Sequence, residues 1–477
     1  METDSVIQLA ALGGAVGTAL VLLARERIAL LAGIAVLAGA EITLALALVP
    51  EDDLEKFVDG PLRIGALIVV VAAVGGLAVV LTRYPTVWPV ALLAVAPFRI
   101  QLDVGSQRAF LLVPLYGVLS AAGLALAVRA LRDREVPRIT PLLAVPVVVL
   151  IGLAGVSSLW SLDVDASAVD LLFFYFPFAL LVAIVARAPL ASWLPVALGG
   201  TLAGIAVLLA VVGLWERTTR QLVLARDLEI GNAYESFFRT ASLLRDPSIY
   251  GRNLAVAILV ILVGLWLTRL NLAAAAAVIA LLGLALFFTY SQSSMVALTV
   301  GILFIAAVAG RGRSRTIVLV GALAPLLLAS AVLAAVGQDE SLGRLTGSRS
   351  DLAANSTDII REHPLGGVGI GAEEKVSEEL GQSRDRLAKS SHTAPLTIAA
   401  ELGALGIAAY LAFLAAAIRL YYLAWLRDRV LGLGTAVVFL AIFVHSLFYS
   451  GFFEDPLVWL SLALAAAAVV AARPLPH

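Results

Sequence analysis

The sequence predicts an all-α protein with about 12–15 membrane-spanning helices, and three observations lead to this fold class. Of the 477 residues, 61% are hydrophobic and only 14% are charged, whereas soluble domains are nearer half apolar and a quarter charged. The mean hydropathy is correspondingly high, at +0.99. The apolar residues form repeated runs of about 20, the length that crosses roughly 30 Å of hydrocarbon. Because backbone polar groups in lipid must be bonded within their own segment, we expect these runs to be helices.

Fifteen runs fit this description, and they divide the chain into three parts. The first part, 1–336, holds twelve expected spans and a polar loop at 215–248. The second, 337–394, is a long polar segment, and the third, 395–477, holds the last three spans. The expected spans lie near 5–24, 28–49, 61–82, 85–100, 109–127, 140–158, 169–186, 193–214, 249–268, 271–290, 294–310, 316–336, 395–418, 430–449 and 456–472.

Arginine is distributed unequally between alternate loops. With the N-terminus outside, the odd-numbered loops and the C-terminal tail hold 16 basic residues against four acidic ones. The even-numbered loops include the acidic stretches Glu51-Asp52-Asp53 and Glu454-Asp455. Since short cytoplasmic loops carry the excess of Lys and Arg, this pattern predicts that segments 215–248 and 337–394 are extracytoplasmic.

Charge and composition exclude several classes of protein. The net charge of −1 gives no electrostatic preference for nucleic acid. The absence of cysteine excludes disulfides and thiolate metal sites. The first five residues carry two acidic side chains and no basic one, which does not fit the start of a cleavable signal peptide.

Segment 337–394 is too long to be a simple connection, and loops of this length are usually functional or disordered. Helix-compatible stretches at 350–362 and 372–387 flank the glycine-rich run Pro364–Gly371. Mixed polarity with such punctuation is unlike a low-complexity linker. We therefore expect a small folded helical cap on the extracytoplasmic side.

Two groups of residues could carry chemistry there. His392 stands where the cap segment enters the thirteenth span, and an imidazole at the water–membrane boundary suits proton transfer; the alternative is a polar residue at a helix start. Arg239, Arg245 and Arg252 lie around the start of the ninth span. Guanidinium groups match phosphate geometry with paired donors. The alternative is that they anchor the protein at lipid headgroups.

Ionisable residues inside expected spans are further candidates, because burying them in lipid is costly. Glu401 lies about 13 Å deeper than His392 on a regular helix, so we expect it to pair within the bundle rather than with His392. His445 lies near the outer end of the fourteenth span. Tyr449 follows four residues later and can share its face.

Several segments together resemble the signature region of the bacterial O-antigen ligase and polymerase family. The family's His-Pro-Leu-x-Gly-Val-Gly turn resembles 363–369, and its Ala-Glu-x-Gly-x-x-Gly helix resembles 400–406, preceded by His392-Thr393. Its Trp-Ser-x-Asp stretch resembles 160–163. Its Arg-x-x-Gly-x-x-x-x-Pro-Asn and Arg-x-x-Leu-Trp stretches resemble the segments that begin at Arg239 and Arg349. The resemblance runs in order from about residue 150 to 460.

The chain also departs from the family pattern. Thr393 stands where the family usually has Asn, and Ala353 or Ala354 replaces the usual Trp. Ser291-Gln292-Ser293-Ser294 stands where Ser-Arg-Gly is common. If that arginine holds a diphosphate in relatives, Arg245 or Arg349 is the candidate to replace it.

The resemblance implies a polytopic, GT-C-like glycosyltransferase of the bacterial inner membrane, with its active site on the extracytoplasmic face. It would move a glycan from undecaprenyl diphosphate to a hydroxyl of a glycan, lipid or protein acceptor, with inversion and without metal or cofactor. His392 would be the general base and Arg239 would stabilise the leaving diphosphate. Further diphosphate ligands would be Arg245, Arg252, Arg349 and Arg361. Ligase and polymerase remain alternatives.

Two other functions remain open on the sequence. A flippase or transporter of lipid-linked oligosaccharide would also be polytopic and rich in arginine, although it predicts basic residues along a path through the spans. A metal-dependent glycosyltransferase could use Asp163 and Asp165, a DxD pair at an outer membrane edge, to bind a divalent ion. The alternative for that pair is a solvated cluster at a helix end.

Overall fold

The computed structural model describes residues 2–49, 61–104, 107–133, 136–225, 228–229, 232–233, 237–310, 312, 315–316, 320, 349–384, 393–449 and 451–471. The N-terminal elements are α1 (Glu2–Leu23), α2 (Arg27–Leu48), α4 (Pro61–Arg83), η1 (Pro85–Val87), α5 (Trp88–Val95), β1 (Ile100–Val104), β2 (Gln107–Leu111), α6 (Val113–Arg132), α7 (Pro141–Ser157), α8 (Val164–Asp170), η2 (Leu171–Tyr175) and α9 (Phe176–Val185). The later elements are α10 (Leu194–Thr219), η3 (Ser242–Leu244), α12 (Pro247–Leu267), α13 (Leu272–Phe287), α14 (Gln292–Ala309), α17 (Arg349–Glu362), α18 (Glu373–Arg384), α19 (Ala394–Arg427), α20 (Arg429–Ser446) and α21 (Pro456–Val470).

The predicted fold class is confirmed. Within the described residues, ten helices are long and apolar enough to cross a membrane, and four shorter apolar helices accompany them. Helices α8, η2 and α9 are continuous and together make one of the ten, at Val164–Val185. The expected twelfth span, 316–336, lies almost wholly outside the described residues.

The expected fourth span is wrong in its extent. The apolar run from 85 forms only a short helix, Pro85–Val95, and residues 100–111 then pair as an antiparallel hairpin. In the hairpin Val104 pairs with Gln107, so two residues connect the strands. The helix ends before Pro97, which has no N–H to continue the helical hydrogen bonds, and in Ile100–Val104 apolar and polar residues alternate with the period of a strand.

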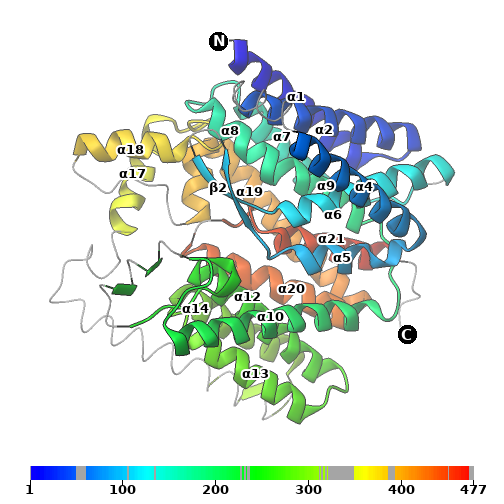
Figure 1. The fold of residues 1–477 in the computed structure, drawn as a ribbon, viewed down its shortest axis with the longest axis vertical. Coiled ribbons are helices and arrows are strands. Elements are labelled where there is room, and N and C mark those ends of the chain that lie inside the picture. The colour runs from blue at the N-terminus through cyan, green and yellow to red at the C-terminus, as the bar shows by residue number, and fades with distance from the viewer. Residues whose placement is uncertain are drawn as a thin grey trace.

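Helix α19 joins two groups of helices (Figure 1). One group contains α1, α2, α4, α6, α7 and α9, and the other contains α10, α12, α13, α14 and α20. Helix α19 packs on α7 in the first group, on α20 in the second, and on α21. Helices α17 and α18 project at one end, where α17 contacts the beginning of α19. A contact that changes the direction of α19 therefore changes its packing against both groups.

An aromatic cluster fixes the segment between α20 and α21. The ring of Phe453 lies 5.7 Å from those of Phe413 and Trp459 and 5.9 Å from that of Tyr410. The Trp459 indole also donates to the Phe453 carbonyl over 2.8 Å. This packing holds the start of α21 against α19, next to the polar residues described below.

Candidate functional site

A glycine-rich turn is inserted into a break in helix α19. Gly403 has a non-helical backbone, with φ 60° and ψ −153°. In a continuous helix the carbonyls of residues 400 and 401 would accept from the N–H groups four residues later. Here the Ala400 carbonyl accepts from Val368 N over 3.0 Å, and the Glu401 carbonyl accepts from Gly369 N over 2.9 Å.

The same turn supplies the acceptors that the break leaves missing. Ala404 N donates to the Pro364 carbonyl over 2.9 Å, and Leu405 N donates to the Leu365 carbonyl over 3.3 Å. Both missing helix bonds are therefore replaced, on the donor side and on the acceptor side. Within a span this replacement is required, because lipid offers backbone groups no partner. We call this arrangement, 364–371 with 400–405, the turn junction.

Glycine is needed at the turn junction for two reasons. Gly367, Gly369 and Gly403 have φ of +65°, +95° and +60°, which side-chain-bearing residues rarely adopt. A Cβ would also lie 2.3 Å from the Glu401 carbonyl carbon at Gly367, and 2.4 Å from Ser161 Cα at Gly369. At Gly403 it would lie 2.4 Å from the Leu365 carbonyl oxygen. Close backbone contact thus explains Gly367 and Gly369 of the turn and Gly403, the first glycine of the helix motif.

The segment between α7 and α8 holds the other side of the turn. Leu162 N donates to the Val368 carbonyl over 3.0 Å. Ser167 Oγ donates to the Ile370 carbonyl over 2.6 Å, and the Trp160 indole donates to the Gly366 carbonyl over 3.1 Å. Three segments that resemble family motifs, near residues 160, 365 and 402, therefore meet in one place.

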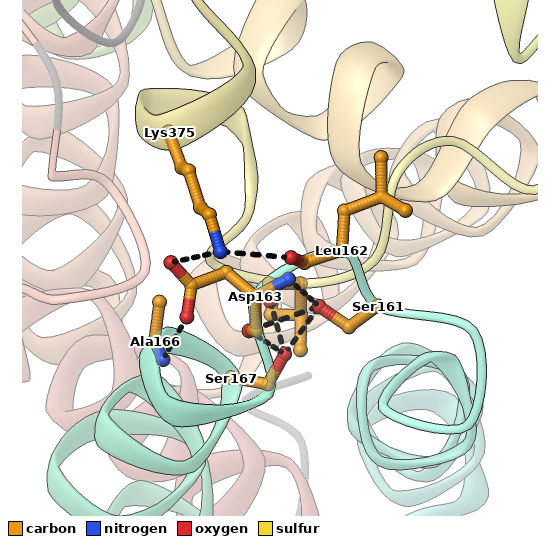
Figure 2. Close-up of polar contacts among 7 residues, drawn as sticks. Ser161, Leu162, Asp163, Ala166, Ser167 and Lys375 are labelled. Atoms are coloured by element: carbon orange, nitrogen blue, oxygen red, sulfur yellow. Dashed lines mark hydrogen bonds and ion pairs between the residues drawn. The ribbon is translucent and has the colours of Figure 1, made fainter. Parts of the chain in front are cut away.

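Asp163 is engaged within this segment, as Figure 2 shows. One carboxylate oxygen accepts from Ala166 N over 3.1 Å and caps α8. The other lies 3.9 Å from Nζ of Lys375, which also donates to the Leu162 carbonyl over 3.3 Å. Asp165 is exposed in the first turn of α8. In the described part of the chain, no three His, Cys, Asp or Glu residues cluster as metal ligands.

Helices α17 and α18, which lie in the described part of segment 337–394, pack on each other and on α19. Ser356 Oγ on α17 donates to a Glu373 carboxylate oxygen on α18 over 2.6 Å. Ile359, Val368 and Ala400 are fully buried together in a small apolar cluster. The two helix-compatible stretches of the cap segment are therefore helices, and their described part is built onto the membrane helix.

Two of the expected diphosphate ligands lie on helix α17. Arg349 is its first residue. Arg361 lies near its end, with a side chain that is 76% exposed and 3.6 Å from the Asp358 carboxylate. At that exposure the ion pair contributes little to stability, so the guanidinium remains available to another anion.

Glu216 organises the arginine-rich segment, 217–245, and is fully buried at the end of α10. One carboxylate oxygen accepts from Ala241 N over 3.0 Å and from Ser242 N over 2.8 Å. The other accepts from Val223 N over 2.9 Å. Both ends of the loop are thereby tied to one side chain. No sequence motif marks this residue.

Arg239 is held by its backbone and by one side-chain nitrogen. Its N–H donates to Asn232 Oδ1 over 2.9 Å, and its carbonyl accepts from Asn232 Nδ2 over 3.0 Å. Its Nε donates to the Thr289 carbonyl at the end of α13 over 3.2 Å. The guanidinium is half-buried, and the described residues place no carboxylate in an ion pair with it.

The loop arrangement leads to one prediction for Glu216. Replacing Glu216 with alanine removes the acceptor of three backbone N–H groups, and a buried donor left unsatisfied costs about 1–3 kcal/mol. We expect faster tryptic cleavage of the 221–242 loop, measured by gel densitometry on purified protein. Glu229→Ala is the matched control, since Glu229 is an exposed glutamate of the same loop. Equal cleavage of both variants would contradict the role of Glu216.

The start of α12 is tied to the end of α20. Asp246 caps α12 with one oxygen, which accepts from Ser248 N over 2.6 Å and from Ile249 N over 2.9 Å. Its other oxygen accepts from the Tyr449 hydroxyl over 2.8 Å. The Tyr449 ring lies 5.3 Å from that of His445, which is fully buried. Arg245, with φ 62°, directly precedes this cap.

Arg252 is occupied by a buried ion pair. Its Nη2 lies 2.6 Å from Asp455 Oδ2, and the two side chains are 4% and 5% exposed. Asp455 also caps α21 by accepting from Leu457 N over 2.8 Å. Burial raises the pKa of the neighbouring Glu454, although Arg99 and Arg252 oppose the shift. This arrangement favours a structural role for Arg252 rather than direct contact with a diphosphate.

The serines that stand in place of the family's Ser-Arg-Gly connect α14 to α12. Ser291 caps α14 by accepting from Ser294 N over 3.4 Å. Ser294 Oγ donates to the Ser248 carbonyl at the start of α12 over 3.2 Å. The segment therefore presents hydroxyl groups where the family usually has a guanidinium.

The structure brings the predicted residues together in two places. Glu401 belongs to the turn junction, where its Oε1 accepts from Gly371 N over 3.0 Å. Arg252, His445 and Tyr449 lie together where α12 and α21 begin and α20 ends. His392 lies outside the described residues, and α19 begins two residues later at Ala394. Since neighbouring helices alternate in direction, both places lie at the same end of the bundle.

These features define a multi-pass membrane protein with motif residues gathered at one end of its helices. Residues 275–411 match the family model of O-antigen ligase, which confirms the family that the motifs resemble. This match supports the O-antigen ligase and polymerase family, and with it glycan transfer and a place in a bacterial inner membrane. A search of the curated proteins found no match to the chain.

Several residues that build the site were not found from the sequence. Glu216 contacts the backbone of Ala241, Asn232 contacts the backbone of Arg239, and Ser167 contacts the glycine turn. Buried polar residues must be bonded, so a glutamate near the end of an apolar run was the available signal for Glu216. The partners of these residues carry no pattern in the sequence, because they are backbone groups.

Proposed function

We propose that this protein is an inverting, metal-independent glycosyltransferase that acts on the extracytoplasmic face of the inner membrane. It moves a glycan from undecaprenyl diphosphate to a hydroxyl of a glycan, lipid or protein acceptor. The observation that carries the proposal is that family motifs from three segments meet at the turn junction. The junction lies within the first turns of α19. The matched family supports glycan transfer and a lipid-linked substrate.

His392 is the proposed general base. As the acceptor oxygen attacks the anomeric carbon, the imidazole takes the hydroxyl proton. The bond from the anomeric carbon to the diphosphate oxygen breaks, and its electron pair leaves with undecaprenyl diphosphate. The proton then passes from the imidazolium to water. A single displacement of this kind inverts the anomeric configuration and needs no nucleophile from the protein.

Arginine side chains are the proposed partners of the diphosphate. Arg239 supports this role best, because the described residues place no carboxylate in an ion pair with it. Fixed positive groups stabilise the charge that develops on the leaving group and act most strongly where water is excluded. Arg245, Arg349 and Arg361 are the further ligands, and we propose that Arg252 instead maintains the scaffold through Asp455.

The glycosyltransferase proposal is tested by reconstitution. Purified protein is placed in liposomes with an undecaprenyl-diphosphate glycan and candidate acceptors, with and without EDTA. We expect transfer that withstands chelation and a product whose anomeric configuration, read by NMR, is inverted. Activity that vanishes with EDTA and returns with Mg²⁺ or Mn²⁺ would favour a metal-dependent enzyme using Asp163 and Asp165. Movement of lipid between leaflets without transfer would favour a flippase.

A further inference from the structure

Gly403 divides α19 into a first segment, Ala394–Leu402, and a second segment that begins at Ala404. The break at Gly403 removes the two hydrogen bonds that would transmit the direction of the first segment to the second. A helix normally inherits its course from such bonds. The orientation of this segment, and of the helix start next to His392, must therefore be set by other contacts.

Those contacts come from the inserted turn. Its backbone bonds the carbonyls of Ala400 and Glu401, and it is itself held by the segment between α7 and α8. Glu401 adds a side-chain bond, since its Oε1 accepts from Gly371 N over 3.0 Å. The turn therefore contacts Glu401 twice, because Gly369 N donates to its carbonyl and Gly371 N donates to its side chain.

The surroundings of Glu401 indicate that it acts as a hydrogen-bond acceptor. It is 7% exposed, and its ionisable neighbours include Asp170 and Glu373, which are acidic. No arginine or lysine within the described residues forms an ion pair with it. Among the described residues, a negative charge on Glu401 therefore has no cation to pair with. A neutral acceptor of the same shape can make the bond to Gly371.

We infer that Glu401 is a positioning residue, which fixes the inserted turn through Gly371 and thereby sets the start of α19, which follows His392 by two residues in the chain. The inference rests on the proposed function, because it assigns the consequence of this positioning to the proposed base. Glu401 does not contact the reacting atoms. It lies seven residues beyond Ala394, roughly 10 Å from the start of α19 on a regular helix, so its influence passes through the turn junction.

The inference is tested with Glu401→Leu and Glu401→Gln, each reconstituted with the lipid-linked donor and an acceptor. We expect Glu401→Leu to lower kcat at least about tenfold, equivalent to about 1.4 kcal/mol in the barrier, with little change in the KM of the donor. Glu401→Gln keeps an acceptor oxygen and should restore a kcat near that of wild type. If glutamine were as damaging as leucine, the carboxylate charge itself would be required and the inference would be wrong.

A second measurement reports position without activity. The chain has no cysteine, so Leu159→Cys with Leu396→Cys gives a clean pair for spin labels on the two sides of the turn junction. We expect the distance distribution to broaden in Glu401→Leu and to match wild type in Glu401→Gln. An unchanged distribution in the leucine variant would overturn the inference. His392→Ala, assayed in parallel, tests the proposed function separately, because it should lose activity while its distance distribution stays unchanged.

Discussion

Replacing His392 with alanine is expected to lower kcat for glycan transfer by about 10²–10⁴-fold, the usual contribution of a general base. The acceptor hydroxyl would then have to lose its proton to water in the transition state. Binding of the lipid-linked donor should persist, because the proposed diphosphate ligands are arginine side chains, which the substitution leaves in place. Single-turnover kinetics in liposomes, together with donor binding by isothermal titration, measure the two effects separately.

The control for this variant is His477→Ala, which removes a histidine from the tail that the charge pattern assigns to the cytoplasm. Its rate should equal that of wild type. Because only the neutral imidazole accepts a proton, the wild-type rate should fall in acidic buffer. If His392→Ala transfers glycan at the wild-type rate, His392 is not the general base, and this conclusion does not depend on the other proposals.

Breaking the buried ion pair is expected to have the largest effect on stability. In Asp455→Ala the Arg252 guanidinium stays buried without its partner, a change that costs about 3–5 kcal/mol. Loss of the cap on α21 adds about 1 kcal/mol. Much of this variant should be lost from the monodisperse fraction after heating, as measured by fluorescence-detected size-exclusion chromatography.

Two controls show whether the buried charge is responsible. Asp133→Ala breaks the exposed ion pair with Arg129, whose side chains are 37% and 51% exposed, and should cost at most about 1 kcal/mol. Arg252→Met with Asp455→Asn removes both charges but keeps an oxygen that can cap α21. This double variant should survive heating better than Asp455→Ala. If it is no more stable, the loss comes from packing and the ion pair is not decisive.

The spans were predictable because their cause is local. Each run of about 20 apolar residues carries its own signal, and a helix was found for every expected span in the described part of the chain. The span expected at 85–100 was predicted too long, because the alternating pattern that begins at Ile100 was not considered. A period of two within a short polar stretch is the stronger signal there.

The site was predictable only as a set of residue types. Family resemblance identified the glycine turn and Glu401, but it could not indicate that the turn would enter the helix that contains Glu401. That event depends on backbone groups, and every residue has these. The partner of Arg252 was equally hidden, because Asp455 lies in another loop and reads as an ordinary acidic helix start.

The inserted turn has a consequence for how the chain enters the membrane. Residues 157–167 are translated first, the turn at 364–371 follows, and the break at Gly403 leaves the ribosome last. Each partner of the interrupted helix is therefore synthesised before the interruption itself. When α19 reaches the translocon, the backbone groups of the turn have already been synthesised. They can therefore bond the free N–H and C=O groups at the break as soon as α19 enters the lipid.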